Sequence, residues 1–128
     1  MLDHITFAVA DIGRSQVFYD KALAPLGMAE IVSLSAEQSG GDAFLGYGAA
    51  GRAFFWISGG KPLIGRLHVA FVAESRTTVE AFYVAAISAG GVDNGGPGVR
   101  AHYDPDYYGA FVLDPDGHNI EAVCRLPG

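Results

Sequence analysis

An internal repeat constrains this chain more than any other feature, because the second half of its 128 residues restates the first half at an offset of 64. Such a repeat indicates that one supersecondary unit is built twice. Each half opens with an alternating strand and continues into an amphipathic helix that ends at glycine. The matches pair His4 with His68, Phe18-Tyr19 with Phe82-Tyr83, Ala22 with Ala86, and Gly27 with Gly91.

The opening strands are predicted over Leu2 to Val9 and over Leu67 to Val72. Side chains alternate along a strand, so His4 lies on the face opposite Phe7, and His68 on the face opposite Phe71. The helices are predicted to begin after two capping residues, Asp11 and Ser75, and to end near Gly27 and at Gly90-Gly91.

Three shorter strands are predicted to follow each helix. The pattern is therefore βαβββ-βαβββ, an α+β fold, with modules of about 1–58 and 66–128 in a single domain, 1–128. The segment from Ser58 to Gly65 is the expected link. The shorter strands are expected over Met28–Leu34, Ala43–Tyr47, Arg52–Ile57, Val99–Tyr103, Gly109–Leu113 and His118–Val123.

Composition narrows the class of protein. Half of the residues are apolar and 17% are charged, which is typical of a folded domain. The net charge of −6 argues against nucleic acid or an anionic membrane as a partner. A single cysteine, Cys124, excludes an internal disulfide, and neither a signal peptide nor a membrane span is expected. The expected location is the cytoplasm.

His4 and His68 occupy equivalent positions on the first strands, and Glu121 lies on the last predicted strand. If the modules pack with pseudo-twofold symmetry, both histidines point into one concave space. Two histidines and one carboxylate with open positions are typical of a catalytic divalent metal, with non-haem Fe(II) the best-known occupant. Mn(II), Ni(II), Co(II) and Zn(II) suit the same ligands. A single strand histidine is more often structural, so the prediction depends on the three residues meeting.

Two segments resemble the glyoxalase/bleomycin-resistance/extradiol dioxygenase (vicinal oxygen chelate) superfamily. They are Leu2-Asp3-His4-Ile5-Thr6-Phe7-Ala8-Val9 and Phe111-Val112-Leu113-Asp114-Pro115-Asp116-Gly117-His118-Asn119-Ile120-Glu121. The resemblance implies two tandem βαβββ modules that form a cupped, partly open mixed β-sheet cleft with flanking helices. It also implies that His4, His68 and Glu121 are the metal ligands.

The chain departs at one position from the pattern of the glyoxalase I members of this superfamily. Aligning Gly51–Phe55 with Gly117–Glu121 places Phe55 opposite Glu121, where glyoxalase I members have a fourth ligand. The remaining set of three ligands resembles that of the extradiol dioxygenases and of the fosfomycin-modifying thiol transferases. Two residues near the proposed metal, Tyr108 and His102, are the predicted catalytic proton donors or acceptors, and a surface turn with aromatic packing is the alternative.

The expected function is a metal-dependent enzyme whose small substrate chelates the metal through oxygens, with a slight preference for extradiol dioxygenase chemistry. The alternatives are a non-catalytic protein that sequesters an antibiotic-type molecule, a lactoylglutathione-lyase-like enzyme and a thiol transferase. The resemblance also implies a homodimer. Substrate, metal identity and the placing of the site within or between chains stay open.

Overall fold

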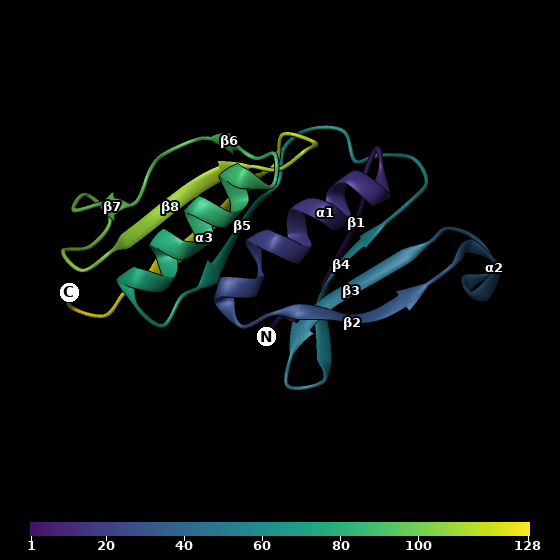
Figure 1. Cartoon of the computed structure of the whole chain (residues 1–128), viewed down its shortest axis with the longest axis horizontal. Helices are drawn as coiled ribbons and strands as arrows, with labels where there is room; N and C mark the ends of the chain where they lie inside the picture. Colours follow the sequence, from purple (N-terminus) through teal and green to yellow (C-terminus); the bar gives the residue numbers. More distant parts are fainter.

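The computed structural model describes all 128 residues and contains two βαβββ modules. Figure 1 shows the first module at one end of an elongated molecule and the second at the other. The first module comprises β1 (Ile5–Ala8), α1 (Ile12–Ala22), η1 (Ala24–Leu26), β2 (Ala29–Leu34), α2 (Ala36–Ser39), β3 (Phe44–Ala49) and β4 (Arg52–Ser58). The second comprises β5 (His68–Val72), α3 (Arg76–Ser88), β6 (Val92–Asp93), β7 (Gly98–Val99), β8 (Tyr108–Leu113) and β9 (Asn119–Cys124).

The two sheets share one topology. The first has the strand order β1-β4-β3-β2, and the second has β5-β9-β8-β6 with β7 also paired to β8. In each sheet the opening strand pairs in parallel with the closing strand, β1 with β4 and β5 with β9. All other pairs are antiparallel. The mixed sheets and their open edges confirm the predicted α+β fold of two tandem modules.

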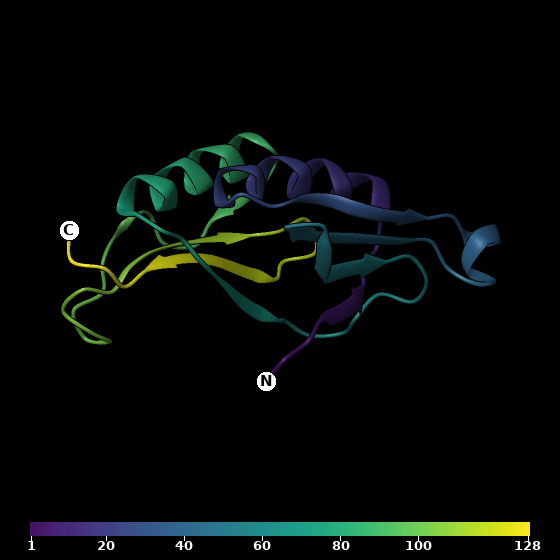
Figure 2. The ribbon, with the colours of Figure 1, turned by 90° about the horizontal axis from the view of Figure 1, so that it is seen from below.

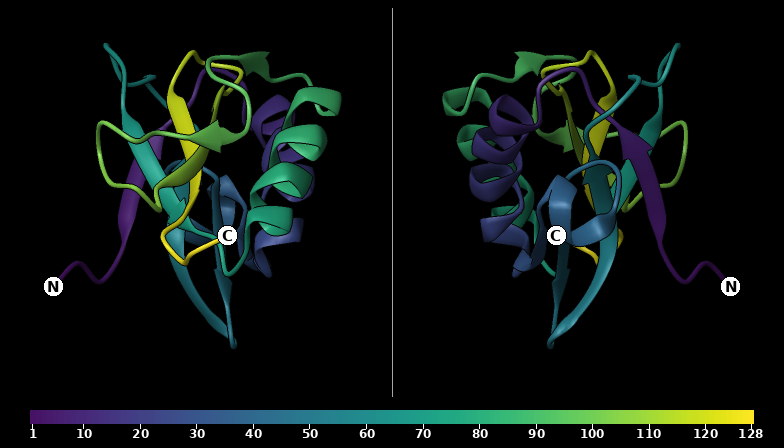
Figure 3. Two further views of the ribbon diagram at one scale, coloured as in Figure 1. Left: turned by 90° about the vertical axis from the view of Figure 1, so that its left-hand side faces the viewer. Right: turned by 90° about the vertical axis from the view of Figure 1, so that its right-hand side faces the viewer.

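Both long helices cover the same face of the sheets, as Figures 2 and 3 show. Asp11 caps α1 by accepting a hydrogen bond from the Arg14 amide, and Ser75 caps α3 by accepting one from the Thr78 amide. Both predicted helix starts are therefore confirmed. We call the uncovered side of the sheets the open face; it carries Thr6, Gly46 and Trp56 in the first sheet and Ala70, Phe111 and Glu121 in the second.

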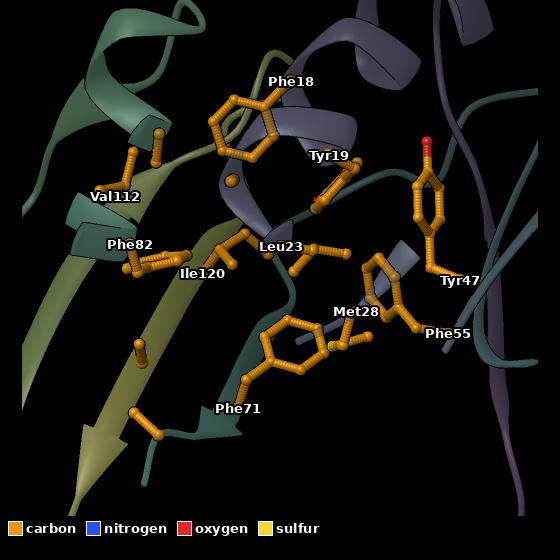
Figure 4. Close-up of a cluster of buried hydrophobic side chains, with 14 of the residues drawn as sticks. Phe18, Tyr19, Leu23, Met28, Tyr47, Phe55, Phe71, Phe82, Val112 and Ile120 are labelled. Atoms are coloured by element: carbon orange, nitrogen blue, oxygen red, sulfur yellow. The ribbon is translucent and has the colours of Figure 1, made fainter. Parts of the chain in front are cut away.

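A single apolar core lies between the helices and the sheets and joins the two modules. Its aromatic residues come from both modules, and Phe55 on β4 packs edge to face with Phe71 on β5 at 5.2 Å between ring centroids. Figure 4 shows Phe18, Leu23 and Ile120 filling the space between these rings and the helices. Burying each such side chain stabilises the fold by about 1.5–3 kcal/mol.

The turn between β8 and β9 fastens the second module to the first through polar contacts. Asp114, which is buried, accepts a hydrogen bond of 2.5 Å from the Tyr19 hydroxyl on α1. Asp116 accepts one of 2.9 Å from the Ala10 amide just before the same helix. The buried hydrogen bond from Tyr19 to Asp114 is costly to leave unmade, so the two modules hold a fixed relation.

One predicted element is wrong, and one short helix was not predicted. The strand expected over Val99–Tyr103 is limited to Gly98–Val99, because the amides of Tyr103 and Asp104 donate to the Arg100 carbonyl and close a turn. The short helix Ala36–Ser39 was not predicted, although Ser35 and Gln38 form a capping box at its start. None of the helices is long and apolar enough to cross a membrane.

Candidate metal site

The second module brings a histidine and a carboxylate together on its open face. β5 and β9 run parallel with Ala70 beside Glu121 and His68 beside Asn119. This register lets the His68 imidazole reach along the sheet, and its Nε2 lies 2.8 Å from Oε1 of Glu121. The Glu121 side chain is only 1% exposed, whereas that of His68 is 54% exposed. The buried carboxylate is therefore reached from solvent past the histidine.

Tyr107 holds the other oxygen of the carboxylate. Its hydroxyl donates a hydrogen bond to Oε2 of Glu121, and its amide donates to the Asp104 carbonyl, which fixes the turn before β8. Burial, followed by the hydrogen bond to Glu121, raises the pKa of Tyr107 to about 12. The phenol therefore stays protonated at neutral pH and remains a hydrogen-bond donor to the carboxylate.

These three residues lie at the wall of a pocket of about 450 Å³. Its cationic residue is Arg125, whose guanidinium lies 4.8 Å from the centre of the Tyr107 ring and makes no ion pair. A cation held over an aromatic face beside a pocket is placed to bind an anionic ligand group. The pocket is lined by His68, His102, Tyr103, Tyr107, Glu121 and Arg125.

Of the predicted catalytic residues, only His102 borders this pocket, where its ring lies 4.1 Å from that of Tyr103. Tyr108 lies on the helix side of the sheet, where its hydroxyl donates to Glu80 on α3 at 2.7 Å. Arg76 covers the Tyr108 ring at 4.9 Å. Successive strand residues point to opposite faces, so Tyr107, and not the predicted Tyr108, lies beside Glu121.

His4 does not join His68 and Glu121 within the chain. It lies just before β1 in the first sheet, and its Nδ1 contacts the Asp3 carboxylate at 2.7 Å. Asp3 in turn pairs with Arg52 at 2.9 Å. No three histidine, cysteine, aspartate or glutamate side chains of the chain come close enough together to hold a metal ion. One chain thus supplies two of the three predicted ligands to one place.

The counterpart of Glu121 in the first module is Trp56, and the sequence alignment with Phe55 was wrong by one residue. Trp56 lies beside Thr6 in the parallel pair of β1 and β4, as Glu121 lies beside Ala70 in the pair of β5 and β9. Phe55 points into the core and is 1% exposed. Neither side chain can ligate a metal, so the first module supplies no fourth ligand from this position.

The donor set fits a divalent cation. Glu121 is a fully buried carboxylate whose charge has no lysine or arginine partner, and such a charge is costly unless a cation compensates it. Imidazole and carboxylate together suit Fe(II), Mn(II), Ni(II) and Zn(II). The hydrogen bond from Tyr107 supports the carboxylate in the way that outer residues orient metal ligands.

Paired βαβββ modules with one open sheet face define the class of protein to which this fold corresponds. A family model described as the Glyoxalase/Bleomycin resistance protein/Dioxygenase superfamily matches residues 1–122, so the chain belongs to this superfamily. The resemblance noted in the sequence is thereby confirmed. No curated protein matches the chain with significance.

Solved structures of similar fold support the assignment. A glyoxalase/bleomycin resistance protein from Albidiferax ferrireducens matches with a TM-score of 0.77 and 29% identity, over 98% of this chain and 99% of the other. A mutant of the fosfomycin resistance protein FosX from Listeria monocytogenes, complexed with Mn(II) and 1S,2S-dihydroxypropylphosphonic acid, matches at 0.70 and 22%, over 96% and 90%. Glyoxalase I from Zea mays matches at 0.71 and 21%, over 99% and 45%. The last two show likeness of fold alone.

Proposed function

We propose that the protein is a divalent-metal-dependent enzyme of this superfamily, acting on a small substrate that chelates the metal through oxygens. The observation that carries the proposal is the buried Glu121 carboxylate, bonded to His68 and Tyr107 at a pocket of about 450 Å³. Pockets of this size suit small molecules. His68 and Glu121 hold the metal, and their remaining neighbours bind the substrate.

The third ligand is proposed to be His4 of the partner subunit in a homodimer. His4 precedes β1, which is an edge strand of the first sheet, and His68 opens β5, an edge strand of the second. Apart from a hydrogen bond from the Leu63 amide to the Ala8 carbonyl at the end of β1, both edges can lie against a second chain. A twofold dimer uses the same surface patches twice, so each pair of chains would form two equivalent sites.

A divalent ion at this site supplies Lewis acidity or, as iron, activation of dioxygen. The protein residues have separable roles around it. Tyr107 donates a hydrogen bond to Oε2 of Glu121 and so leaves Oε1 and the His68 imidazole directed at the pocket. His102, at the pocket wall, is placed to accept or donate a substrate proton, and Arg125 binds an anionic group.

Extradiol cleavage of a catechol-like ring is the reaction we favour, because the two-histidine, one-carboxylate set with open positions is typical of non-haem Fe(II) oxygenases. A second candidate is transformation of a phosphonate epoxide. It is favoured by the unpaired Arg125 at the pocket and by the ligand described for the FosX neighbour. The two differ in metal, since only the first requires iron and dioxygen.

Metal content tests the proposal. Protein purified without chelator is analysed for bound elements, and the metal-free form is titrated with Fe(II), Mn(II), Ni(II) and Zn(II). We expect about one ion per chain, as one site per chain requires, and loss of this ion in Glu121→Ala, which removes a ligand. The proposal is wrong if none of the four ions binds tightly to the unmodified protein.

Mixing two inactive variants tests the shared site. His4→Ala and Glu121→Ala homodimers each lack one ligand in both sites. After unfolding and refolding together, half of the dimers are mixed, and each mixed dimer contains one complete site. We therefore expect about a quarter of the normal metal content in the mixture. A mixture that stays as empty as its components contradicts a site divided between chains.

A further inference from the structure

Trp56 occupies, in the first module, the position that Glu121 occupies in the second. Thr6 and Ala70 are separated by the repeat offset of 64, and each has one of these two residues as its parallel neighbour. Thr6 lies two residues after His4 on the same open face. A site that includes His4 of the first module therefore also lies beside the pair of β1 and β4, and Trp56 is on β4.

The indole of Trp56 lies flat across the sheet because its other neighbour is a glycine. Gly46 on β3 is the antiparallel partner of Trp56. A Cβ atom at position 46 would lie 2.8 Å from two carbons of the indole ring, well inside contact distance. Because Gly46 has no side chain, the indole ring rests directly on the backbone of β3.

On the side of β3 and β2, the neighbours of the ring on this face are apolar. Val32 on β2 is the partner of Gly46, and Phe44 on β3 lies two residues from it. Trp56, Val32 and Phe44 are partly buried, yet none belongs to the core or packs against it. The first module thus offers an aromatic surface where the second offers a histidine and a carboxylate.

We propose that Trp56 is a specificity residue of the shared site, a fixed flat surface that selects substrates carrying an aromatic ring; this rests on the proposed function. The substrate oxygens face His68 and Glu121 of one chain, and its ring stacks on Trp56 of the partner that contributes His4. Offset stacking of flat rings adds binding energy beyond the burial of their area. Trp56 thus sets the preference for aromatic chelators, and other residues hold the metal.

Two hydroxamates with the same chelating group test the inference. Benzohydroxamate carries a phenyl ring where acetohydroxamate carries a methyl group, and Zn(II)-loaded protein binds both without redox chemistry. Because Trp56 is the sole tryptophan of the chain, its fluorescence reports on the ring directly. We expect benzohydroxamate to alter this fluorescence and to bind more tightly than acetohydroxamate.

Three variants define the cause. Trp56→Leu is expected to weaken benzohydroxamate binding by about fivefold to tenfold and to leave acetohydroxamate binding unchanged, since only the ring stacking is lost. Trp56→Phe keeps a flat ring and restores most of the difference. Gly46→Ala keeps the tryptophan but forces the indole off the sheet, so the same loss is expected with no change at position 56.

The outcomes separate this inference from the proposed function. Metal uptake with equal benzohydroxamate affinity in the unmodified protein and in Trp56→Leu overturns the role of Trp56 alone. Equal losses for both hydroxamates also overturn it, because the tryptophan would then act on the metal site. Absence of metal uptake overturns the proposed function and this inference with it.

Discussion

The two modules have the same strand order, and each has one long helix after its first strand, but one open face is polar and the other is aromatic. In the second module the face carries His68 and Glu121 beside a pocket, and in the first it carries Trp56 above Gly46. The helix sides have not diverged in this way, because both contribute aromatic and aliphatic residues to one core. A duplicated unit can therefore keep the residues that pack in the core while the residues of its open face acquire a different function.

A second contrast concerns the equivalent tyrosines of the two helices. Tyr19 on α1 is fully buried and donates to Asp114 of the other module. Tyr83 on α3 is half-buried and donates to Asp93 of its own module at 3.0 Å. The same residue thus fastens the modules together in one repeat and serves only a local contact in the other.

The largest effect is expected from two neighbours on β4 that face opposite sides. Phe55→Ala removes a buried ring from the shared core and should lower the free energy of unfolding by about 3–5 kcal/mol. Trp56→Ala removes a ring from the open face and should cost about 1 kcal/mol. Urea denaturation measures both. Similar losses for the two variants would show that the open face of the first module is part of the core.

The next largest effect is expected on the free energy of unfolding when Tyr19 and Tyr83 are compared. Tyr19→Phe leaves the buried Asp114 carboxylate without its hydroxyl donor and should cost about 1–3 kcal/mol of unfolding free energy. Tyr83→Phe, the control at the equivalent position, should cost about 0.5 kcal/mol or less because its hydrogen bond is exposed. Thermal unfolding of the two variants side by side decides the matter, and a Tyr83→Phe loss as large as that of Tyr19→Phe would refute the assigned difference.

Adjacent tyrosines before and in β8 sharpen the placing of the site. Tyr107→Phe removes the hydrogen bond to Glu121 and should weaken metal binding by about tenfold, as loss of residues behind metal ligands does. Tyr108→Phe removes only the bond to Glu80 and should leave metal affinity unchanged. Titration with Mn(II) compares them. Weaker binding in Tyr108→Phe alone would return the supporting role to the residue predicted from the sequence.

The smallest effect is expected on stability at high pH, where Tyr107 ionises. The pKa of Tyr107 is raised to about 12, chiefly by burial and then by Glu121, from an ordinary value near 10. Its contribution to stability is therefore complete below about pH 10 and is lost as the pH rises through about 12. Absorbance titration of the phenolates should show one group fewer ionising near pH 10 in the unmodified protein than in its unfolded form, after allowing for the other raised tyrosines. Ionisation of Tyr107 near pH 10 would contradict its bond to a carboxylate.

Much of the fold could be predicted from the sequence because the repeat, the strand alternation and the two helix caps are local signals. The faces assigned to His4 and His68 agree with the observed pattern, in which Phe7 and Phe71 are buried. Hydrogen bonds from Asp11 and Ser75 to the first turns account for the correct helix starts. These features depend on neighbours within a few residues.

At the site, the structure differs from the sequence-based placing of two residues, and both differences have one physical origin. Tyr108 was chosen over Tyr107, and Phe55 was aligned where Trp56 belongs. In both cases a shift of one residue along a strand moves the side chain to the other face of the sheet. Arg125 lies beyond the last predicted strand, and only the folded chain brings it to the pocket.

The position of His4 relative to His68 depended on a different kind of information. It is set by how the modules pack through α1, α3 and the shared core, and no local pattern encodes that arrangement. A repeat predicts that equivalent residues have equivalent surroundings within their modules. It does not predict which modules face each other across a cavity.

The fastening of the β8–β9 turn to α1 has a consequence for how such a protein can change over generations. Asp114 and Asp116 of one repeat hold Tyr19 and Ala10 of the other. A recombination event that replaced either half would separate these contacts and divide the core at the same time. The open faces, by contrast, can exchange residues singly. We therefore expect recombination to keep the two halves together, and new activities to arise by point substitution on the sheet surface.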